Sequence, residues 1–130
     1  MKVMVDENLP PPMAKALAAL FAGKHEVVHL REKFGSAVKD TEWIGALNAE
    51  GHWVIISADR RITKNKAERQ AFKSSKLVGF FLSSGLQKAE LTKLVERLMA
   101  LWETIETQAE LVDGGAMFEI PMTSSKLNVI

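Results

Sequence analysis

Four short apolar runs, each followed by a polar or helical stretch, constrain the fold of this chain more than any other feature. The runs are Val3–Val5, Val27–Val28, Val54–Ile56 and Val78–Leu82. β-branched and aromatic residues in runs this short favour buried strands. Strands that alternate with helices form a mostly parallel sheet covered by helices on both faces. The sequence therefore predicts a single α/β domain with a three-layer α/β/α architecture.

Apolar stripes at helical spacing lie between these runs. The first stripe begins at Met13, with Asn8 as its predicted N-cap and Gly23 as its predicted end. A second helix is predicted from about Thr41 to Asn48, with Asp40 at its N-cap. The intervening polar stretch, residues 31–39, is predicted to be a loop.

The longest helix is predicted near the C-terminus. Ser84 and Gln87 have the spacing of a capping box, and a helix from about Gln87 to Glu106 would place one apolar stripe on the sheet. A last strand is expected over residues 116–120. We assign the domain to residues 1–121 and expect residues 122–130 to be a polar tail that is either loosely ordered or held by a partner.

Composition excludes several classes of protein. The chain has 130 residues, of which 47% are hydrophobic, so it can bury a core and is not a disordered protein. Cysteine is absent, which rules out disulfides, zinc–thiolate sites and cysteine nucleophiles. A net charge of +1 does not by itself indicate nucleic-acid binding. There is neither a membrane-spanning apolar stretch nor a signal-peptide pattern, so we expect a cytoplasmic protein without membrane contact.

Acidic residues follow two of the predicted strands and precede one helix. Asp6 and Glu7 end the first strand, Asp59 follows the third, and Asp40 stands before the second helix. Ligands of open α/β sheets bind outside the carboxyl ends of the strands, where these acids would meet. Hard oxygen ligands without cysteine favour Mg²⁺ or Mn²⁺, which can activate water against a phosphodiester.

Basic residues begin directly after Asp59. Arg60, Arg61 and Lys64 open a stretch rich in lysine and arginine, and they would lie beside the metal site. We predict that these cations hold a polyanionic backbone such as that of RNA. The alternative is that they form a solvated helix face.

Each acid also has a structural interpretation. Asp6 and Glu7 could end a strand and favour the next helix dipole, Asp40 could be an N-cap only, and Asp59 could be a turn residue. We interpret all three histidines as structural because they lack ligand spacing, and the three tryptophans as core residues. The acids indicate a site only as a set.

The opening of the chain resembles a known family. The sequence Asp-Glu-Asn-Leu-Pro at residues 6–10, directly after a strand, is similar to the start of PIN-like domains found as toxins of bacterial toxin–antitoxin modules. The resemblance extends over about the first 85 residues, through residues 25–29, Asp40 and residues 55–59. It implies a Mg²⁺- or Mn²⁺-dependent ribonuclease in which Asp6, Asp40 and Asp59 are catalytic metal-site acids and Glu7 is a further ligand. It also implies an RNA substrate and an antitoxin partner. Whether the chain forms a homodimer as well is left open.

One position departs from that family pattern. Relatives carry a second aspartate two residues after the position of Asp59, followed by an aromatic residue, whereas this chain has Arg61 and Ile62. A missing carboxylate would weaken metal binding or leave a site for a single metal ion. The alternative function is a catalytically inactive module that binds RNA or a partner without cutting. A receiver-like signalling domain is a third possibility, with Ser83 as its hydroxyl. Against it, Ile120-Pro121-Met122 stands where such domains place a lysine.

Overall fold

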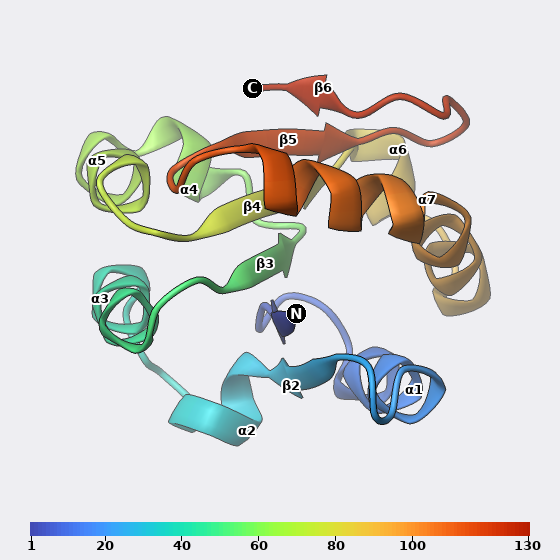
Figure 1. Ribbon diagram of the computed structural model, residues 1–130, viewed down its shortest axis with the longest axis horizontal. Coiled ribbons are helices and arrows are strands. Elements are labelled where there is room, and N and C mark those ends of the chain that lie inside the picture. The colour runs from blue at the N-terminus through green and yellow to red at the C-terminus, as the bar shows by residue number, and fades with distance from the viewer.

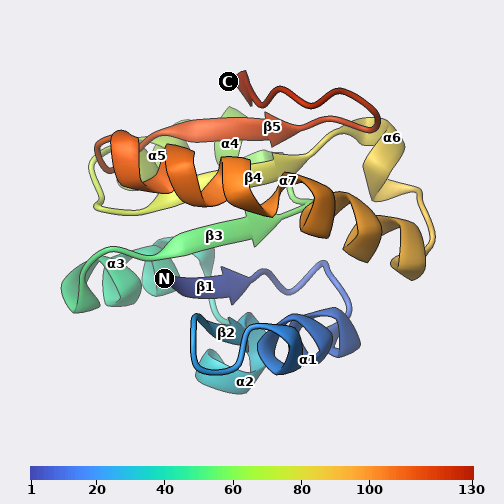
Figure 2. The same ribbon diagram turned by 45° about the vertical axis from the view of Figure 1, so that its right-hand side comes forward.

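A single six-stranded sheet runs through the protein in this computed structural model, which describes all 130 residues (Figure 1). The strand order is β2-β1-β3-β4-β5-β6. The strands are β1 (Lys2–Val5), β2 (Glu26–His29), β3 (Val54–Ser57), β4 (Val78–Leu82), β5 (Met117–Ile120) and β6 (Asn128–Val129). All neighbours pair in parallel except β5 and β6. The prediction of a mostly parallel α/β sheet is confirmed, and Figure 2 shows β1 and β3 pointing in the same direction.

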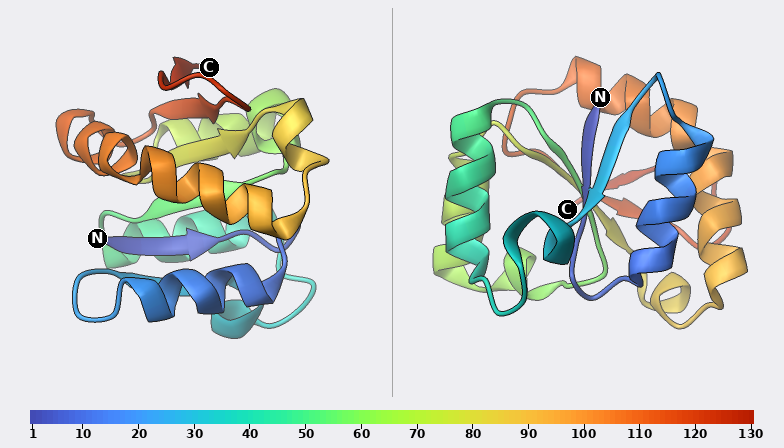
Figure 3. Two further views of the ribbon diagram at one scale, coloured as in Figure 1. Left: turned by 90° about the vertical axis from the view of Figure 1, so that its right-hand side faces the viewer. Right: turned by 90° about the horizontal axis from the view of Figure 1, so that it is seen from below.

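Seven helices connect and cover the strands. They are α1 (Pro11–Leu20), α2 (Leu30–Phe34), α3 (Asp40–Glu50), α4 (Arg61–Lys64), α5 (Lys66–Lys73), α6 (Ser84–Gln87) and α7 (Leu91–Leu111). Seen from below, α1 and α7 lie on one side of the sheet, and α3 and α5 lie on the other (Figure 3). The predicted three-layer arrangement is therefore present.

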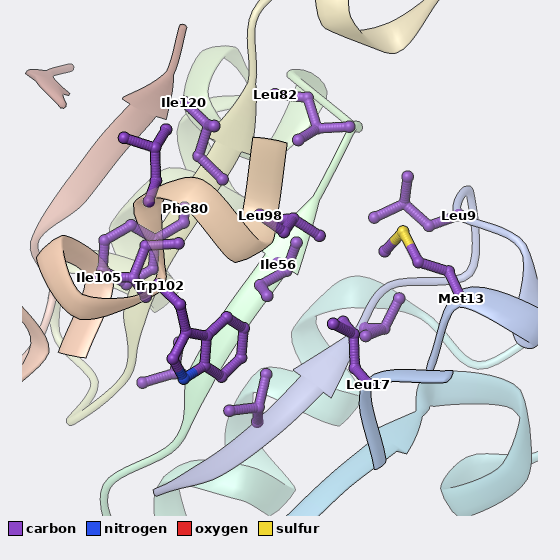
Figure 4. Packing of buried hydrophobic residues seen from close by; sticks show 14 of the residues in the cluster. Leu9, Met13, Leu17, Ile56, Phe80, Leu82, Leu98, Trp102, Ile105 and Ile120 are labelled. Atoms are coloured by element: carbon purple, nitrogen blue, oxygen red, sulfur yellow. The ribbon is translucent and has the colours of Figure 1, made fainter. Parts of the chain in front are cut away.

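Alternation along each strand divides the core into two clusters. Successive strand residues point to opposite faces of a sheet, so Val3 and Val5 pack in a cluster of 21 buried residues, while Met4 packs in a second cluster of 12. The larger cluster lies under α1 and α7, and Figure 4 shows Leu17 and Trp102 approaching the sheet from these helices. Because both faces are covered, the central strands are apolar throughout and show no polar alternation.

The first helix begins later than predicted. Its N-cap is Pro10, which offers no side-chain hydrogen bond, so the expectation that Asn8 caps it is wrong. The Asn8 side chain instead accepts a hydrogen bond from the amide of Ala58, at 3.3 Å. Prolines lack the amide that a cap would satisfy, so the helix start does not require Asn8.

Residues 31–39 are not entirely a loop. Leu30 is buried and begins the short helix α2, capped by the Nδ1 atom of His29, which accepts from the Arg31 amide at 3.1 Å. The predicted cap role of Asp40 is also wrong, because Lys39 occupies the N-cap of α3 and Asp40 is already helical. A hydropathy pattern does not show such short-range hydrogen bonds, so it does not predict α2 or the N-cap of α3.

The capping box expected from Ser84 and Gln87 does not form. Ser83, not Ser84, caps the short α6, and its Oγ accepts from the Leu86 amide at 3.4 Å. The Gln87 side chain donates to the Leu82 carbonyl at 3.0 Å, and α7 begins only at Leu91. The apolar stripe of α7 is buried as predicted from Leu94 onward.

The C-terminal tail ends in a strand and is not loosely ordered, which was one of the two states we expected. Phe118 and Val129 are register partners in an antiparallel pair, and the Ile130 amide donates to the Met117 carbonyl at 3.0 Å. Before β5, Gly115 (φ +90°) lies against the backbone of Lys73, where a Cβ would not fit. None of the helices combines the length and apolar character needed to cross a bilayer.

Two histidines have structural partners, as predicted. The ring of His25 contacts the N-terminal amine at 2.9 Å and the Glu106 carboxylate at 3.0 Å, which ties the start of the chain to α7. The Nε2 atom of His29 donates to the Leu9 carbonyl at 2.7 Å. Both rings therefore position backbone segments.

The chain changes direction across the sheet between β1 and β3. After β1 it crosses to β2 on one side, then returns through α3 to β3 on the other. This is a topological switch point, where the connections that follow neighbouring strands diverge and leave a crevice at their carboxyl ends. Asp6 and Asp59 follow those two strands, so the fold directs both acids to this crevice.

The buried stripe of α7 gives a direct test of the fold. Leu98 is fully buried, so Leu98→Ala should lower the free energy of unfolding by about 2–5 kcal/mol, measured by chemical denaturation. Leu91 is on the same helix but 37% exposed, and Leu91→Ala should cost less than about 1 kcal/mol. Equal losses in the two variants would contradict this orientation of α7.

Candidate functional site

A cavity of about 470 Å³ opens at the carboxyl ends of β1 and β3. It is lined by Asp6, Glu7, Asn8, Leu30, Val38, Lys39, Asp40, Thr41, Asp59, Arg61 and Glu68. Five of these residues carry carboxylates and two carry cationic side chains. All four acids singled out from the sequence therefore face one cavity, together with a fifth that the sequence analysis missed.

Asp6 is the most deeply buried acid of the cavity, with 4% of its surface exposed. Its amide donates to the Ile56 carbonyl at 2.9 Å, which continues the ladder between β1 and β3 by one residue. Its carboxylate accepts from Ser57 Oγ and from the Glu7 amide, both at 2.7 Å. Burial raises the pKa of Asp6; these hydrogen bonds oppose the rise, while the charges of Asp40 and Asp59 add to it.

The loops after β1 and β3 are tied together by side chains. Ser57 is fully buried, and its Oγ donates to Asp6 and accepts from the Asp59 amide at 2.9 Å. Asn8 reaches across to the Ala58 amide. These contacts fix the place of Asp59 relative to Asp6.

Asp40 and Glu68 form a close pair of carboxylates from two different helices. Asp40 accepts from Trp43 Nε1 at 2.9 Å, which anchors it to the buried indole one turn along α3. Glu68 on α5 lies within hydrogen-bonding reach of Asp40. Burial raises the pKa of Glu68, and the negative charge of Asp40 raises it further.

One oxygen of this pair is left without a partner. Glu68 Oε2 is shielded from solvent and accepts no hydrogen bond. Such an atom is costly unless a proton or a cation compensates it. The pair of Asp40 and Glu68 is therefore the part of the cavity whose electrostatics most require a cationic ligand or a shared proton.

Asp59 is already compensated by an arginine of its own loop. Arg61 Nε contacts both oxygens of Asp59 at 3.0 Å, Nη2 contacts Oδ2 at 2.6 Å, and the Arg61 amide donates to Oδ1 at 2.9 Å. Burial raises the pKa of Asp59, but the hydrogen bonds and charge of Arg61 outweigh it, so the pKa lies below the ordinary value. Arg61 thus occupies, with opposite charge, the place where relatives were expected to carry a further acid.

The other predicted residues lie at or outside the rim. Glu7 is paired with Arg31 at 3.7 Å across the rim. Arg60 points toward β5, where its Nη1 atom lies 2.8 Å from Glu119, and it does not line the cavity. Lys64 is exposed at the end of α4 and does not line the cavity either. Of the three predicted RNA-binding cations, only Arg61 faces the acids.

Sequence reasoning missed Glu68 and Ser57. Glu68 lies in a strongly basic stretch and appeared to be one charge among many; only the packing of α5 against α3 directs it to the cavity. Ser57 follows three apolar residues, and a hydroxyl at the end of a fully buried strand was the available signal. A polar residue there requires a buried partner, which is Asp6.

The side chains of the cavity have the chemistry that a hard divalent cation requires, but their spacing fits such a cation less well. Carboxylate oxygens suit Mg²⁺ or Mn²⁺, and the unpartnered oxygen of Glu68 marks a position where a cation would be compensated. However, no group of three or more His, Cys, Asp or Glu side chains lies close enough together to hold a metal ion. The residues therefore fit a cation held by one or two carboxylates and several waters, which is common for Mg²⁺.

The buried charge of Asp6 predicts a pH-dependent effect of Asp6→Asn in metal-free buffer. Because burial raises the folded-state pKa, the unfolded chain ionises first as pH rises above the ordinary value of 3.8. The free energy of unfolding therefore falls as pH rises from this value to the folded-state pKa, and it stays lowered at higher pH. Asp6→Asn should raise Tm at pH 7, and the gain should vanish below pH 3.8, where the carboxyl is protonated in both states.

An exposed aspartate provides the control for this comparison. Asp113 is exposed in the turn after α7. Asp113→Asn removes one negative charge from the surface and should leave Tm nearly unchanged. A fall in Tm at pH 7 for Asp6→Asn would show that the two hydrogen bonds accepted by Asp6 outweigh its desolvation.

The strand order alone does not decide between function classes. Flavodoxin-like and receiver-like domains share the order 2-1-3-4-5, and fold does not imply function. The features that would mark a receiver are not found: Ser83 caps α6, Pro121 follows β5, and Asp59 is held by Arg61. The geometry agrees better with a cation-binding carboxylate cavity.

Comparison with known proteins identifies the family. Residues 1–84 match the family model described as a PIN-like domain, and these residues include every acid of the cavity. No curated protein and no solved structure matches the chain. PIN-like domains belong to a superfamily of nuclease type. Since the match covers well over half of its length, this chain belongs to the PIN-like domain family.

Proposed function

We propose that this protein is a Mg²⁺- or Mn²⁺-dependent ribonuclease that acts in the cytoplasm. The observation that carries the proposal is the meeting of Asp6, Asp40, Asp59 and Glu68 in one cavity of a PIN-like domain. A shielded carboxylate oxygen without a partner lies in that cavity, which supports a cationic ligand there. The reaction would be hydrolysis of a phosphodiester, which leaves a phosphate monoester on one fragment and a hydroxyl on the other.

Asp40, Glu68 and Asp6 have two different parts in this proposal. Asp40 and Glu68 are the carboxylates that would hold the cation, because they lie close together and Glu68 Oε2 accepts no hydrogen bond. When bound, the cation would lower the pKa of a water and neutralise charge on the phosphoryl group. Asp6 adds negative charge from the floor of the cavity and is fixed there by Ser57.

Cations at the rim would hold the nucleic acid. Lys39 and Arg61 line the cavity, and Lys64 is exposed at the end of α4. Their charges are complementary to a phosphate backbone, and such contacts weaken as the salt concentration rises. Arg60 is the weakest member of the predicted set, because Glu119 already pairs with it.

The second candidate function is a PIN-like interaction module without nuclease activity. It is favoured by one observation, the pairing of Arg61 with Asp59, which removes a carboxylate from those available to a metal. Such a module would bind RNA or a protein without cutting RNA. The cleavage experiment below separates the two candidates.

The toxin role rests on the resemblance of the first 85 residues or so to toxins of toxin–antitoxin modules. We propose a cognate antitoxin protein as partner, encoded beside this chain, and a homodimer of this chain as a further assembly. Co-expression of the neighbouring reading frame with a tagged copy of this chain tests the partner. Copurification at a fixed ratio would support it, and recovery of this chain alone would contradict it.

RNA cleavage should depend on Asp40. Asp40→Asn retains an oxygen that can accept from Trp43 but removes the charge beside Glu68. We expect Mn²⁺-dependent cleavage of mixed single-stranded RNA to fall by about 100-fold or more. The measurement is the initial rate of fragment formation with protein purified free of contaminating nuclease.

Glu42→Gln is the matched control. Glu42 is in the same first turn of α3 but is exposed and outside the cavity, so its loss should leave the rate within about twofold. Equal rates for Asp40→Asn and the unmodified protein would contradict the proposed site. RNA binding without any cleavage by the unmodified protein would favour the interaction module.

A further inference from the structure

Arg61 and Asp59 form the tightest ion pair of the cavity, and its two members differ sharply in exposure. The Asp59 side chain is 12% exposed inside the cavity, while that of Arg61 is 82% exposed at the rim. The guanidinium therefore reaches inward from a position where its remaining surface is open to solvent and to any ligand that approaches the rim.

We propose that Arg61 is a tethered counter-ion of Asp59 that moves to a nucleic-acid phosphate when one binds, so that phosphate and divalent cation bind this cavity cooperatively. The ligand class, a phosphodiester backbone, rests on the proposed function. The exchange itself follows from the placement of the two side chains.

Exchange of partners is inexpensive for Arg61. The Arg61 end of the pair is open to water, which screens the attraction between the two charges. A phosphate accepts the planar fork of a guanidinium in the same bidentate manner as a carboxylate. Arg61 would therefore lose little when it leaves Asp59, and its backbone amide can still donate to Asp59 Oδ1.

The departure of Arg61 changes the charge of the cavity. Asp59 then has no cation beside it and adds its charge to those of Asp6, Asp40 and Glu68, which already oppose one another. A divalent cation compensates this group better once Asp59 is free. By linkage, a cation that binds Asp59 must in turn make Arg61 more available to phosphate.

Arg61, the residue that departs from the family pattern, thereby has a role of its own. An arginine in the place of an acid compensates Asp59 while no phosphate is bound, and it makes cation binding weak until a polyanion is present. Glu68 supplies a carboxylate that the expected pattern did not include.

The test is Mn²⁺ binding by calorimetry, with Arg61→Gln compared with the unmodified protein. Because Arg61 is exposed, its replacement should not disturb folding. Without nucleic acid, we expect Arg61→Gln to bind Mn²⁺ about five- to tenfold more tightly. Lys66→Gln removes the same charge at the exposed start of α5 and should change the affinity by less than about twofold.

The second arm adds a short single-stranded oligonucleotide with charged phosphorothioate linkages, which resist hydrolysis. It should tighten Mn²⁺ binding by the unmodified protein by about five- to tenfold and leave Arg61→Gln unchanged. An uncharged methylphosphonate oligonucleotide of the same length should have no effect on either protein. Titration of Mn²⁺ into each oligonucleotide alone is subtracted.

Equal Mn²⁺ affinities of the unmodified protein and Arg61→Gln would overturn the proposal, as would an equal response of both to the charged oligonucleotide. Absence of Mn²⁺ binding in both proteins would also overturn it. Failure of the proposed function is distinct: a protein that shows this coupling but cuts no RNA would contradict the ribonuclease and leave the role of Arg61 standing.

Discussion

The hydrogen bond from Ser57 to Asp6, 2.7 Å long and fully buried, joins the two strands whose ends form the cavity. It satisfies a carboxylate that burial makes costly, and the same hydroxyl accepts from the Asp59 amide. The apolar strands on both sides cannot compensate a charge, so the site depends on this contact. The parallel pairing of β1 and β3 brings the two strand ends together, and this hydrogen bond fixes the Asp6 carboxylate against Ser57.

The negative charge of the cavity is compensated unevenly. Arg61 neutralises Asp59, hydrogen bonds stabilise Asp6, and the pair of Asp40 and Glu68 retains an oxygen without a partner. A carboxylate oxygen without a partner favours cation binding, because a site whose charges are all neutralised would attract a cation only weakly. The unpartnered oxygen of Glu68 and the ion pair of Arg61 with Asp59 therefore lie in the same cavity, and of these two acids only Asp59 is neutralised by a direct cationic contact.

The sheet could be predicted from the sequence because its strands are short, apolar and buried on both faces, so that Val54–Ile56 and Val78–Leu82 stand out from any helical pattern. The four acids could be placed at one edge by topology alone. The local capping could not, since Asn8 and Ser84 have the right chemistry for caps but tertiary contacts and prolines decide otherwise. Glu68 could not be found either, because its role depends on how α5 packs against α3.

The measurement that tests this account most directly is the diffraction of Mn²⁺-soaked crystals at a wavelength that gives anomalous signal from manganese. The account predicts an anomalous peak inside the cavity, bonded to a carboxylate oxygen of Asp40 or Glu68. A cavity without a peak, while Mn²⁺ binds elsewhere or not at all, would contradict it.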